Sequence, residues 1–426
     1  MVDSVEALDE IDRSNTSTLT AMLLVAGTCI GGGMLALPLT SGFAGFWPSL
    51  CVMLLCWLTM TATGLLLLEA SLWMDEGCHY ISMAQRFLGM PGRVVAWILY
   101  LFVGYGSVVA YTAGGGEQIA FAVEELTGVW LGKTMSSVAF LTLFGMIIYG
   151  GGVVLGRINT LLFFGMLGAY VLLVGMGLRL VDVQLLMHQQ WAWSWLPIPL
   201  FLTAFSFQSM VPSLPPMLRR DPKALRWAVL GGSTLALGIY SLWQCVILGI
   251  IPAYGESSLA QAFTEAKPAT YYLKDQLGTG LTYYIAEYFA FFALVTSFLG
   301  IGLGLFDFLA DGLRIRKTPS GKLMISLFIA VPTLFFALNF ERAFLVAMDS
   351  TGGYGDSILS GILPVMMVWV GRYRMGLTSS VRLPGGRIVL VLIGLFFTGV
   401  LAMELGNHMG WLPTLLESAQ PYLDSN

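Results

Sequence analysis

The sequence carries very little charge for its length. Asp, Glu, Lys and Arg make up 11% of its 426 residues, whereas they make up about a quarter of an ordinary soluble domain. Hydrophobic residues make up 57%, and the mean hydropathy is +0.78. A soluble core cannot absorb that much apolar surface, so the composition predicts a protein whose solvent is the bilayer. The small net charge of -4 argues against a nucleic-acid partner.

Metal ligands and catalytic motifs are scarce as well. The five cysteines show no CxxC or Cys/His spacing, so neither a disulfide framework nor a bound metal is expected. His79, His188 and His408 lie in loops or at the ends of apolar runs, and the sequence has no HExxH motif and no Gly-rich phosphate loop. No repeated polar face of the kind that lines a channel is evident. We therefore expect neither an enzyme nor a cofactor.

Long apolar runs supply the predicted membrane spans. Each is long enough to cross about 30 Å of hydrocarbon as a helix. We expect about 11 transmembrane helices, which cover residues 19–41, 46–72, 94–122, 135–155, 158–179, 197–217, 225–251, 281–309, 322–339, 354–371 and 386–405. The sequence thus predicts an all-α, polytopic membrane protein surrounded by lipid.

The basic residues predict the orientation of these helices, because cytoplasmic loops are richer in Lys and Arg. With the N-terminus in the cytoplasm, 16 of the 21 basic residues fall on the cytoplasmic side. The outer side receives only Lys133, Arg179, Lys267, Lys274 and Arg342. We expect residues 1–18 to form a cytoplasmic tail, and residues 372–426 to hold the last helix and an external C-terminal tail.

Two connecting segments are longer than a simple connection requires. Residues 73–93 include a predicted interfacial helix from His79 to Leu88, and residues 253–278 are long enough to form an external lid. Long ordered loops often gate a site. A solvated connector remains the alternative for each segment.

The first span contains four glycines and a proline. It reads AGTCIGGGMLALP from Ala26 to Pro38, and each interior glycine costs about 1 kcal/mol of helix stability. A helix that unwinds at mid-membrane needs such residues. Its free N–H groups attract a carboxylate and its free carbonyls attract a cation, which suits a zwitterionic amino acid. Close packing between helices is the alternative role of these glycines.

The sixth span is interrupted in a similar way. The stretch TAFSFQSMVPSLPP, from Thr203 to Pro216, combines a polar cluster with three prolines and is hard to accommodate in a continuous helix. Breaks five helices apart predict two five-helix repeats of opposite topology, residues 19–179 and 180–371, followed by an extra helix 11. The substrate site is then expected at the midplane, between the two repeats.

Acidic residues inside the spans are candidates for ion coupling, since buried carboxylates are costly in the bilayer and are typically functional. Glu117 and Glu287 lie deepest in their predicted spans, and we expect them to carry a proton. Glu69, Asp307 and Glu404 lie near predicted helix ends, and we expect them to reach water.

Three stretches carry a resemblance to a known family. They are AGTCIGGGMLALPL, AFSFQSMVPSL and ALVTSFLGIGLGLFDFLAD, which begin at Ala26, Ala204 and Ala293. The sequence resembles the hydroxy and aromatic amino acid permeases of the amino acid–polyamine–organocation superfamily, and most closely the tyrosine-specific permeases. The resemblance implies a LeuT-type arrangement in a bacterial inner membrane, and secondary active import of tyrosine or tryptophan by symport with protons.

Carried onto this chain, the resemblance also implies which residues meet the substrate. The backbone of the substrate is expected to contact helices 1 and 6, at Gly27, Thr28, Gly31, Gly32, Gly33 and Ser206. The aromatic ring is expected to contact Tyr111, Phe207 and Gln208, because rings stack and an amide recognises a phenolic hydroxyl. Ordinary packing is the alternative role of Tyr111 and Phe207.

Coupling to sodium is the alternative to coupling to protons. Ala293, Thr296 and Ser297 have the A-x-x-T-S spacing of the site between helices 1 and 8 in sodium-coupled LeuT-type transporters, where oxygen ligands hold the ion. In a proton-coupled relative the same hydroxyls hydrogen-bond helix 8 to the unwound helix 1, and we favour this second role.

Overall fold

The computed structural model describes residues 17–75, 78–150, 152–265, 269–270, 272–273, 280–340 and 342–411, and within these ranges every regular element is helical. Nine helices of the described part are long and apolar enough to cross a membrane. They are α4 (Phe46–Leu72), α5 (Tyr80–Thr127), α6 (Lys133–Gly150), α7 (Gly152–Gly177), α11 (Pro222–Ile250), α14 (Leu281–Gly312), α15 (Pro319–Asn339), Ala343–Tyr373 and α18 (Gly386–His408).

The remaining two crossings are the broken helices. Helix 1 consists of α2 (Thr18–Cys29) and α3 (Gly33–Ala44), which meet at an angle of 59° across three residues. Helix 6 consists of α9 (Ile198–Ala204), the 3₁₀ turn η2 (Gln208–Ser213) and α10 (Leu214–Met217). Both breaks fall where the sequence places clustered glycines or polar residues and prolines. The predicted interruptions of helices 1 and 6 are therefore confirmed.

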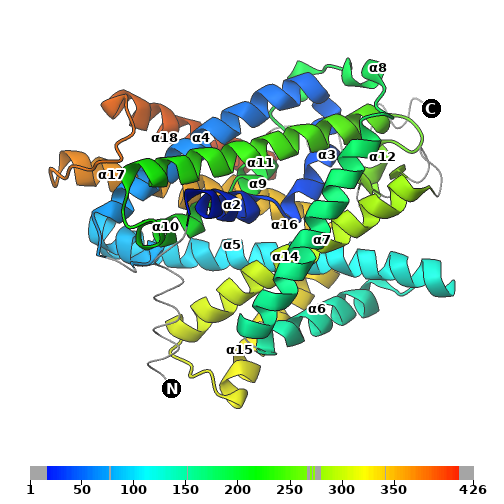
Figure 1. Cartoon of the computed structure of the whole chain (residues 1–426), viewed down its shortest axis with the longest axis horizontal. Coiled ribbons are helices and arrows are strands. Elements are labelled where there is room, and N and C mark those ends of the chain that lie inside the picture. The colour runs from blue at the N-terminus through cyan, green and yellow to red at the C-terminus, as the bar shows by residue number, and fades with distance from the viewer. Residues whose placement is uncertain are drawn as a thin grey trace.

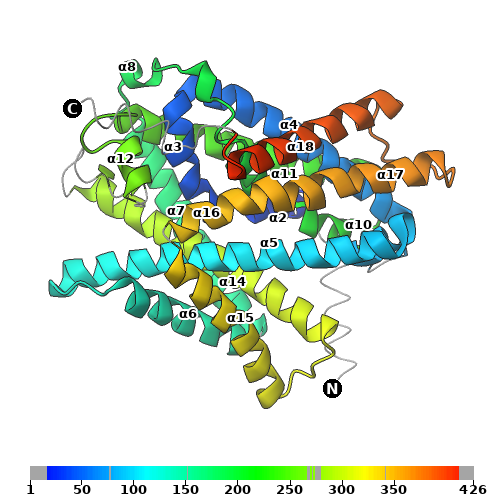
Figure 2. The same cartoon turned by 180° about the vertical axis from the view of Figure 1, so that it is seen from behind.

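The helices form a bundle with two distinct ends. Figure 1 shows α8 (Val183–Leu186) and α12 (Leu259–Thr264) at one end and α10 at the other, with α2 near the centre. Seen from behind, α16 (Ala343–Ser350) and α17 (Leu363–Tyr373) continue one another beside α5 (Figure 2). Between α16 and α17 lies η3 (Thr351–Ile362), a π-helical segment.

Four helices differ from their predicted bounds by five residues or more. α6 ends at Gly150 rather than at residue 155, and α7 begins at Gly152 rather than at residue 158. The predicted interfacial helix of residues 79–88 is the first part of α5, which continues to Thr127 across a kink at Gly89, where φ is 70°. Pro91 follows this kink, and its ring restricts the preceding backbone. Helix 10 begins at Ala343, eleven residues before the predicted start at residue 354. The extra turns carry Asp349 and two glycines, which lowered the apparent hydropathy.

The segment after α11 covers the C-terminal end of α3 as far as it is described. Leu259 of α12 is buried and lies against Gly42. Phe43 packs edge-on against Tyr254 and Phe263, with ring centroids 6.1 and 5.6 Å apart. This placement is consistent with the predicted lid, but its gating role stays a prediction, and residues 266–268, 271 and 274–278 of the segment lie outside the described residues.

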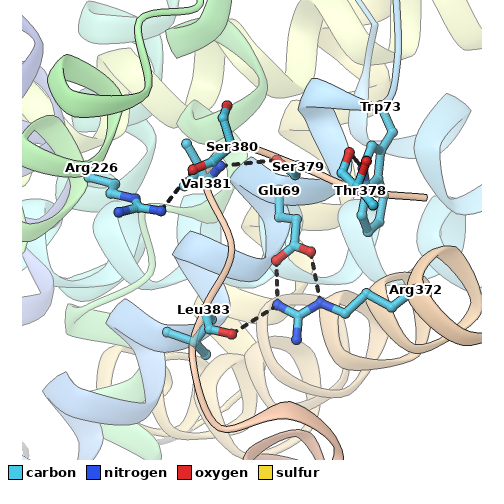
Figure 3. A network of polar contacts seen from close by, with 9 residues as sticks. All are labelled: Glu69, Trp73, Arg226, Arg372, Thr378, Ser379, Ser380, Val381 and Leu383. Carbon is cyan, nitrogen blue, oxygen red and sulfur yellow. Dashed lines mark hydrogen bonds and ion pairs between the residues drawn. The ribbon is translucent and has the colours of Figure 1, made fainter. Parts of the chain in front are cut away.

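The expectation that Glu69 reaches water is wrong. Its side chain is 1% exposed and forms a bidentate ion pair with Arg372 of α17, at 2.7 and 2.5 Å. Figure 3 shows the loop after α17 folded over this pair. The loop is held by three side chains that donate to its carbonyls: Arg372 to Leu383, Trp73 to Thr378 and Arg226 to Ser380.

The other two carboxylates near helix ends behave differently from each other. Asp307 reaches water as expected and pairs with Lys317, and both side chains are 47% exposed. Glu404 is buried and hydrogen-bonded to the Asp349 carboxyl, so the expectation that it reaches water is wrong. A hydrogen bond between two carboxyl groups requires a proton on one of them. Proximity to a helix end therefore does not predict whether a carboxylate reaches water when a buried partner lies close to it.

We expect the buried pair to stabilise the fold far more than the exposed one. Replacing Arg372 by Met leaves the Glu69 carboxylate buried without its partner, which should cost about 3–5 kcal/mol. Lys317→Met removes the same charge from an exposed pair and should cost less than about 1 kcal/mol. Thermal unfolding of the purified variants in detergent measures the difference. Equal melting temperatures for the two variants would contradict the stabilising role of the buried pair.

Candidate functional site

The break in helix 1 is stabilised by a hydroxyl group of α14, which is the eighth of the predicted spans. Ser297 of α14 accepts a hydrogen bond from the Gly32 N–H at 2.9 Å. The Tyr111 hydroxyl of α5 is hydrogen-bonded to Ser297 in turn. Helices 1, 3 and 8 therefore meet at one polar cluster, in which an N–H without an intrahelical acceptor finds a partner.

The glycines of this break permit close contact with neighbouring helices. A Cβ atom at Gly32 would lie 2.8 Å from the Tyr111 ring and 3.0 Å from Leu294. A Cβ atom at Gly31 would overlap the Ser297 hydroxyl. At both positions the backbone itself forms the contact surface, so a side chain there would displace the groups that hold the break together.

The two broken helices touch each other. A Cβ atom at Gly33, the first residue of α3, would lie 3.9 Å from the Ala204 Cα atom at the end of α9. The Tyr240 hydroxyl of α11 lies 2.5 Å from the Cys29 carbonyl oxygen and 2.8 Å from the Ala204 carbonyl oxygen. The last carbonyls of α2 and of α9 have no donor within their own helices. The single Tyr240 hydroxyl lies within hydrogen-bonding distance of both of them.

Ser206 connects the break of helix 6 to helix 10. Its hydroxyl donates to the Asp356 carboxylate of η3 at 2.5 Å, and the Ser360 hydroxyl donates to the same oxygen at 2.7 Å. Asp356 is 1% exposed. Two further contacts lie beside this one: Thr203 donates to the Met348 carbonyl at 2.8 Å, and the Gly352 backbone lies against α9.

Phe207 and Gln208 contact α4 in this conformation. A Cβ atom at Gly64 would lie 2.6 Å from the Phe207 ring, and the Gln208 amide donates to the Met60 carbonyl and the Thr63 hydroxyl, each at 3.1 Å. Both side chains are buried. These contacts fit the packing alternative for Phe207, and a role of either residue toward substrate stays a prediction.

Gly27 and Thr28 lie before the break, in the last turn of α2. Gly27 is half-buried beside Phe163 of α7. Thr28 is exposed, and its hydroxyl donates to the Leu24 carbonyl of its own helix at 2.6 Å. The structure therefore brings Gly31, Gly32 and Gly33 together with Tyr111, while Thr28 lies outside this buried cluster.

The predicted coupling residues fall into two groups. Ser297 is in the cluster, whereas the Thr296 hydroxyl donates to the Phe292 and Ala293 carbonyls of its own helix at 2.9 and 3.2 Å. Glu117 and Glu287 are half-buried, and they lie in the C-terminal part of α5 and near the N-terminus of α14, respectively. At 1.5 Å per residue, Glu117 lies about 9 Å along its helix from Tyr111, and Glu287 about 15 Å along its helix from Ser297.

Sequence reasoning missed Tyr240 and Asp356, which the structure places beside the breaks. Asp356 lies in the predicted span 354–371, and its position in a run of small residues, GGYGDS, is the signal that could have found it. Tyr240 lies in an apolar helix between Ile239 and Ser241, and its spacing carries no comparable signal. Only the contact between α11 and the two breaks reveals its role.

The sequence matches known proteins over nearly its whole length. The family model described as the tryptophan/tyrosine permease family matches residues 14–404. Tyrosine-specific transport system 1 of Haemophilus influenzae is 30% identical over 93% of this chain and 98% of its own length. A tryptophan-specific transport protein of Pseudomonas aeruginosa is 28% identical over 93% and 96%, respectively.

A solved structure shares the fold at low sequence identity. The transporter MhsT, solved in complex with L-phenylalanine, superposes with a TM-score of 0.66 at 12% identity, over 89% of this chain and 98% of that one. This likeness supports a LeuT-type fold with two inverted five-helix repeats and an extra helix 11. Together with the family match over nearly the whole sequence, it shows that the chain is a multi-pass membrane protein and not an enzyme, and that it belongs to the tryptophan/tyrosine permease family.

Proposed function

We propose that this permease imports an aromatic amino acid, tyrosine in the first place and tryptophan in the second, by proton symport with alternating access. The observation that carries the proposal is the contact between the two broken helices at Gly33 and Ala204. Such breaks present helix termini to a substrate inside the membrane. The names of the relatives, which are tyrosine- and tryptophan-specific transport proteins, support the substrate class.

The half-helix ends suit the two charges of an amino acid. The N-terminus of α3, at Gly33, carries the positive end of a helix dipole and suits the substrate carboxylate. The C-terminal ends of α2 and α9 present the Cys29 and Ala204 carbonyls, which suit the ammonium group. The Tyr111 ring, which lies against Gly32, is placed to stack on an aromatic side chain. Gly27, Gly31 and Ser206 complete the proposed backbone site.

We place the protein in a bacterial inner membrane with its N-terminus in the cytoplasm. The distribution of basic residues supports this orientation. Arg219, Arg220 and Lys223 follow α10, and Arg372 and Arg374 lie at or just beyond the end of α17. That end of the bundle in Figure 1 is then cytoplasmic, and the end with α8 and α12 is external.

Protons are the proposed coupling ion, with sodium as the alternative. The Ser297 hydroxyl is hydrogen-bonded to the helix 1 break, and the Thr296 hydroxyl to its own helix. This arrangement supports a structural role for both hydroxyls in linking helix 8 to helix 1. Glu117 and Glu287 remain the proton carriers proposed from the sequence.

Proteoliposomes should accumulate labelled tyrosine when an inward proton gradient is imposed, because the proton supplies the free energy of uptake. We expect the same rate with and without sodium, and stronger competition from unlabelled tryptophan than from phenylalanine. Filtration of the vesicles over time measures uptake. Uptake that survives collapse of the gradient with an uncoupler would contradict proton symport, and uptake that requires sodium would favour the alternative.

Replacing Gly32 by Leu should abolish uptake without loss of membrane insertion. The new side chain would displace Tyr111 and Leu294 at the break of helix 1. Gly168→Leu is the matched control, because this glycine lies in α7, is exposed, and a Cβ atom there would meet no other atom within 4 Å. Tyrosine uptake measures the activity of both variants, and size-exclusion profiles show whether both are folded. Normal uptake by the Gly32 variant would contradict the proposed role of this glycine in the substrate site.

A further inference from the structure

The π-helical segment η3 carries a carboxyl group in the centre of the protein. Asp356 is 1% exposed, and its Oδ1 atom accepts hydrogen bonds from Ser206 and Ser360. Its buried Oδ2 atom has no hydrogen-bond partner among the described residues. Burying a carboxylate with an unsatisfied oxygen is costly, so such groups persist in membrane spans where they have a function.

This carboxyl group lies at the contact between helix 10 and the break of helix 6. Ser206 follows the end of α9 by two residues, so its bond to Asp356 fixes the start of the interrupted segment. Gly352 allows η3 to approach α9, since a Cβ atom there would lie 2.6 Å from the Thr203 hydroxyl oxygen. Glu117 and Glu287 differ from Asp356 in this respect, because they lie about two and three helical turns, respectively, from the residues that contact the break of helix 1.

The charged and titratable groups around Asp356 are few in the described part of the chain. The phenols of Tyr80 and Tyr111, both from α5, interact with it electrostatically, and the Tyr80 hydroxyl donates to the Leu359 carbonyl of the same π segment. Helix α9 contributes no titratable side chain. The remaining groups pair with one another: Asp349 of α16 with Glu404 of α18, and Arg372 of α17 with Glu69 of α4. No cation among them is paired with Asp356.

We infer that Asp356, in place of Glu117 or Glu287, takes up the coupling proton, an inference that rests on the proposed symport. In each cycle one proton from the external water binds the carboxylate, and the same proton leaves the carboxyl group for the cytoplasmic water. Hydrogen bonds to a charged acceptor are about twice as strong as neutral ones. Protonation therefore weakens the bond from Ser206 and loosens helix 10 from the break of helix 6, where the substrate binds.

Asp356→Asn mimics the protonated carboxyl group and tests the inference. In proteoliposomes with the membrane potential clamped, one proton per substrate sets a limit of about tenfold accumulation for each unit of pH difference. We expect the variant to lose this accumulation and only equilibrate tyrosine, while it still exchanges internal unlabelled tyrosine for external labelled tyrosine. Asp307→Asn is the matched control at an exposed carboxylate, and it should keep both activities.

The outcomes separate the inference from the proposed function. Failure of the unmodified protein to accumulate tyrosine would overturn proton symport itself. Normal accumulation by a folded Asp356→Asn variant would overturn only the role of Asp356. Loss of exchange by that folded variant would also overturn it, because the carboxylate would then be needed for substrate binding rather than for coupling.

Ser360→Ala provides a second test that does not depend on the folding of the first variant. This change removes one of the two hydroxyl donors to Asp356. If Asp356 is the carrier, the midpoint of the pH dependence of tyrosine binding should move to higher pH by about one unit, since a hydrogen bond to a charged group is lost. Ser241→Ala is the control, because its hydroxyl donates to a carbonyl of its own helix. An unchanged midpoint in the Ser360 variant would overturn the inference.

Discussion

Backbone polar groups that lose their helical partners inside a bilayer must find others, and the whole site depends on how this chain meets that requirement. At the break of helix 1, Ser297 accepts from the Gly32 N–H, and Tyr240 lies at the carbonyls that end α2 and α9. Each of these side chains belongs to an unbroken helix. The continuous helices therefore act as a scaffold that holds the broken segments of the two discontinuous helices in place.

The same scaffold explains how movement could be transmitted through the protein. Helix 10 is joined to the break of helix 6 by Asp356 and Ser206, and to the end of helix 2 (α4) by Arg372 and Glu69. The first link is a hydrogen bond that depends on the charge of one carboxyl group, whereas the second is a buried ion pair. A proton at the first link would change the position of helix 6 while the second holds helix 10 in place.

Much of the fold could be predicted from the sequence, because span length and glycine clusters are local signals. The breaks at residues 30–32 and after Ala204 lie within the predicted interrupted stretches for this reason. The functional site was harder to predict from the sequence. Glu69 is buried because it pairs with Arg372, which lies far away in the sequence. Glu404 is buried beside Asp349, which lies in a helix whose predicted start was too late. The role of Tyr240 appears only when three helices are packed together.

The measurement that tests the account most directly is the internal pH of proteoliposomes when tyrosine is added outside. With equal pH and no membrane potential at the start, an inward tyrosine gradient should drive protons inward and acidify the lumen, as reported by a trapped pH-sensitive dye. Proton entry should stop when the opposing proton gradient balances the remaining tyrosine gradient. Tyrosine entry without acidification would contradict the claim that the site between the broken helices couples an aromatic amino acid to a proton.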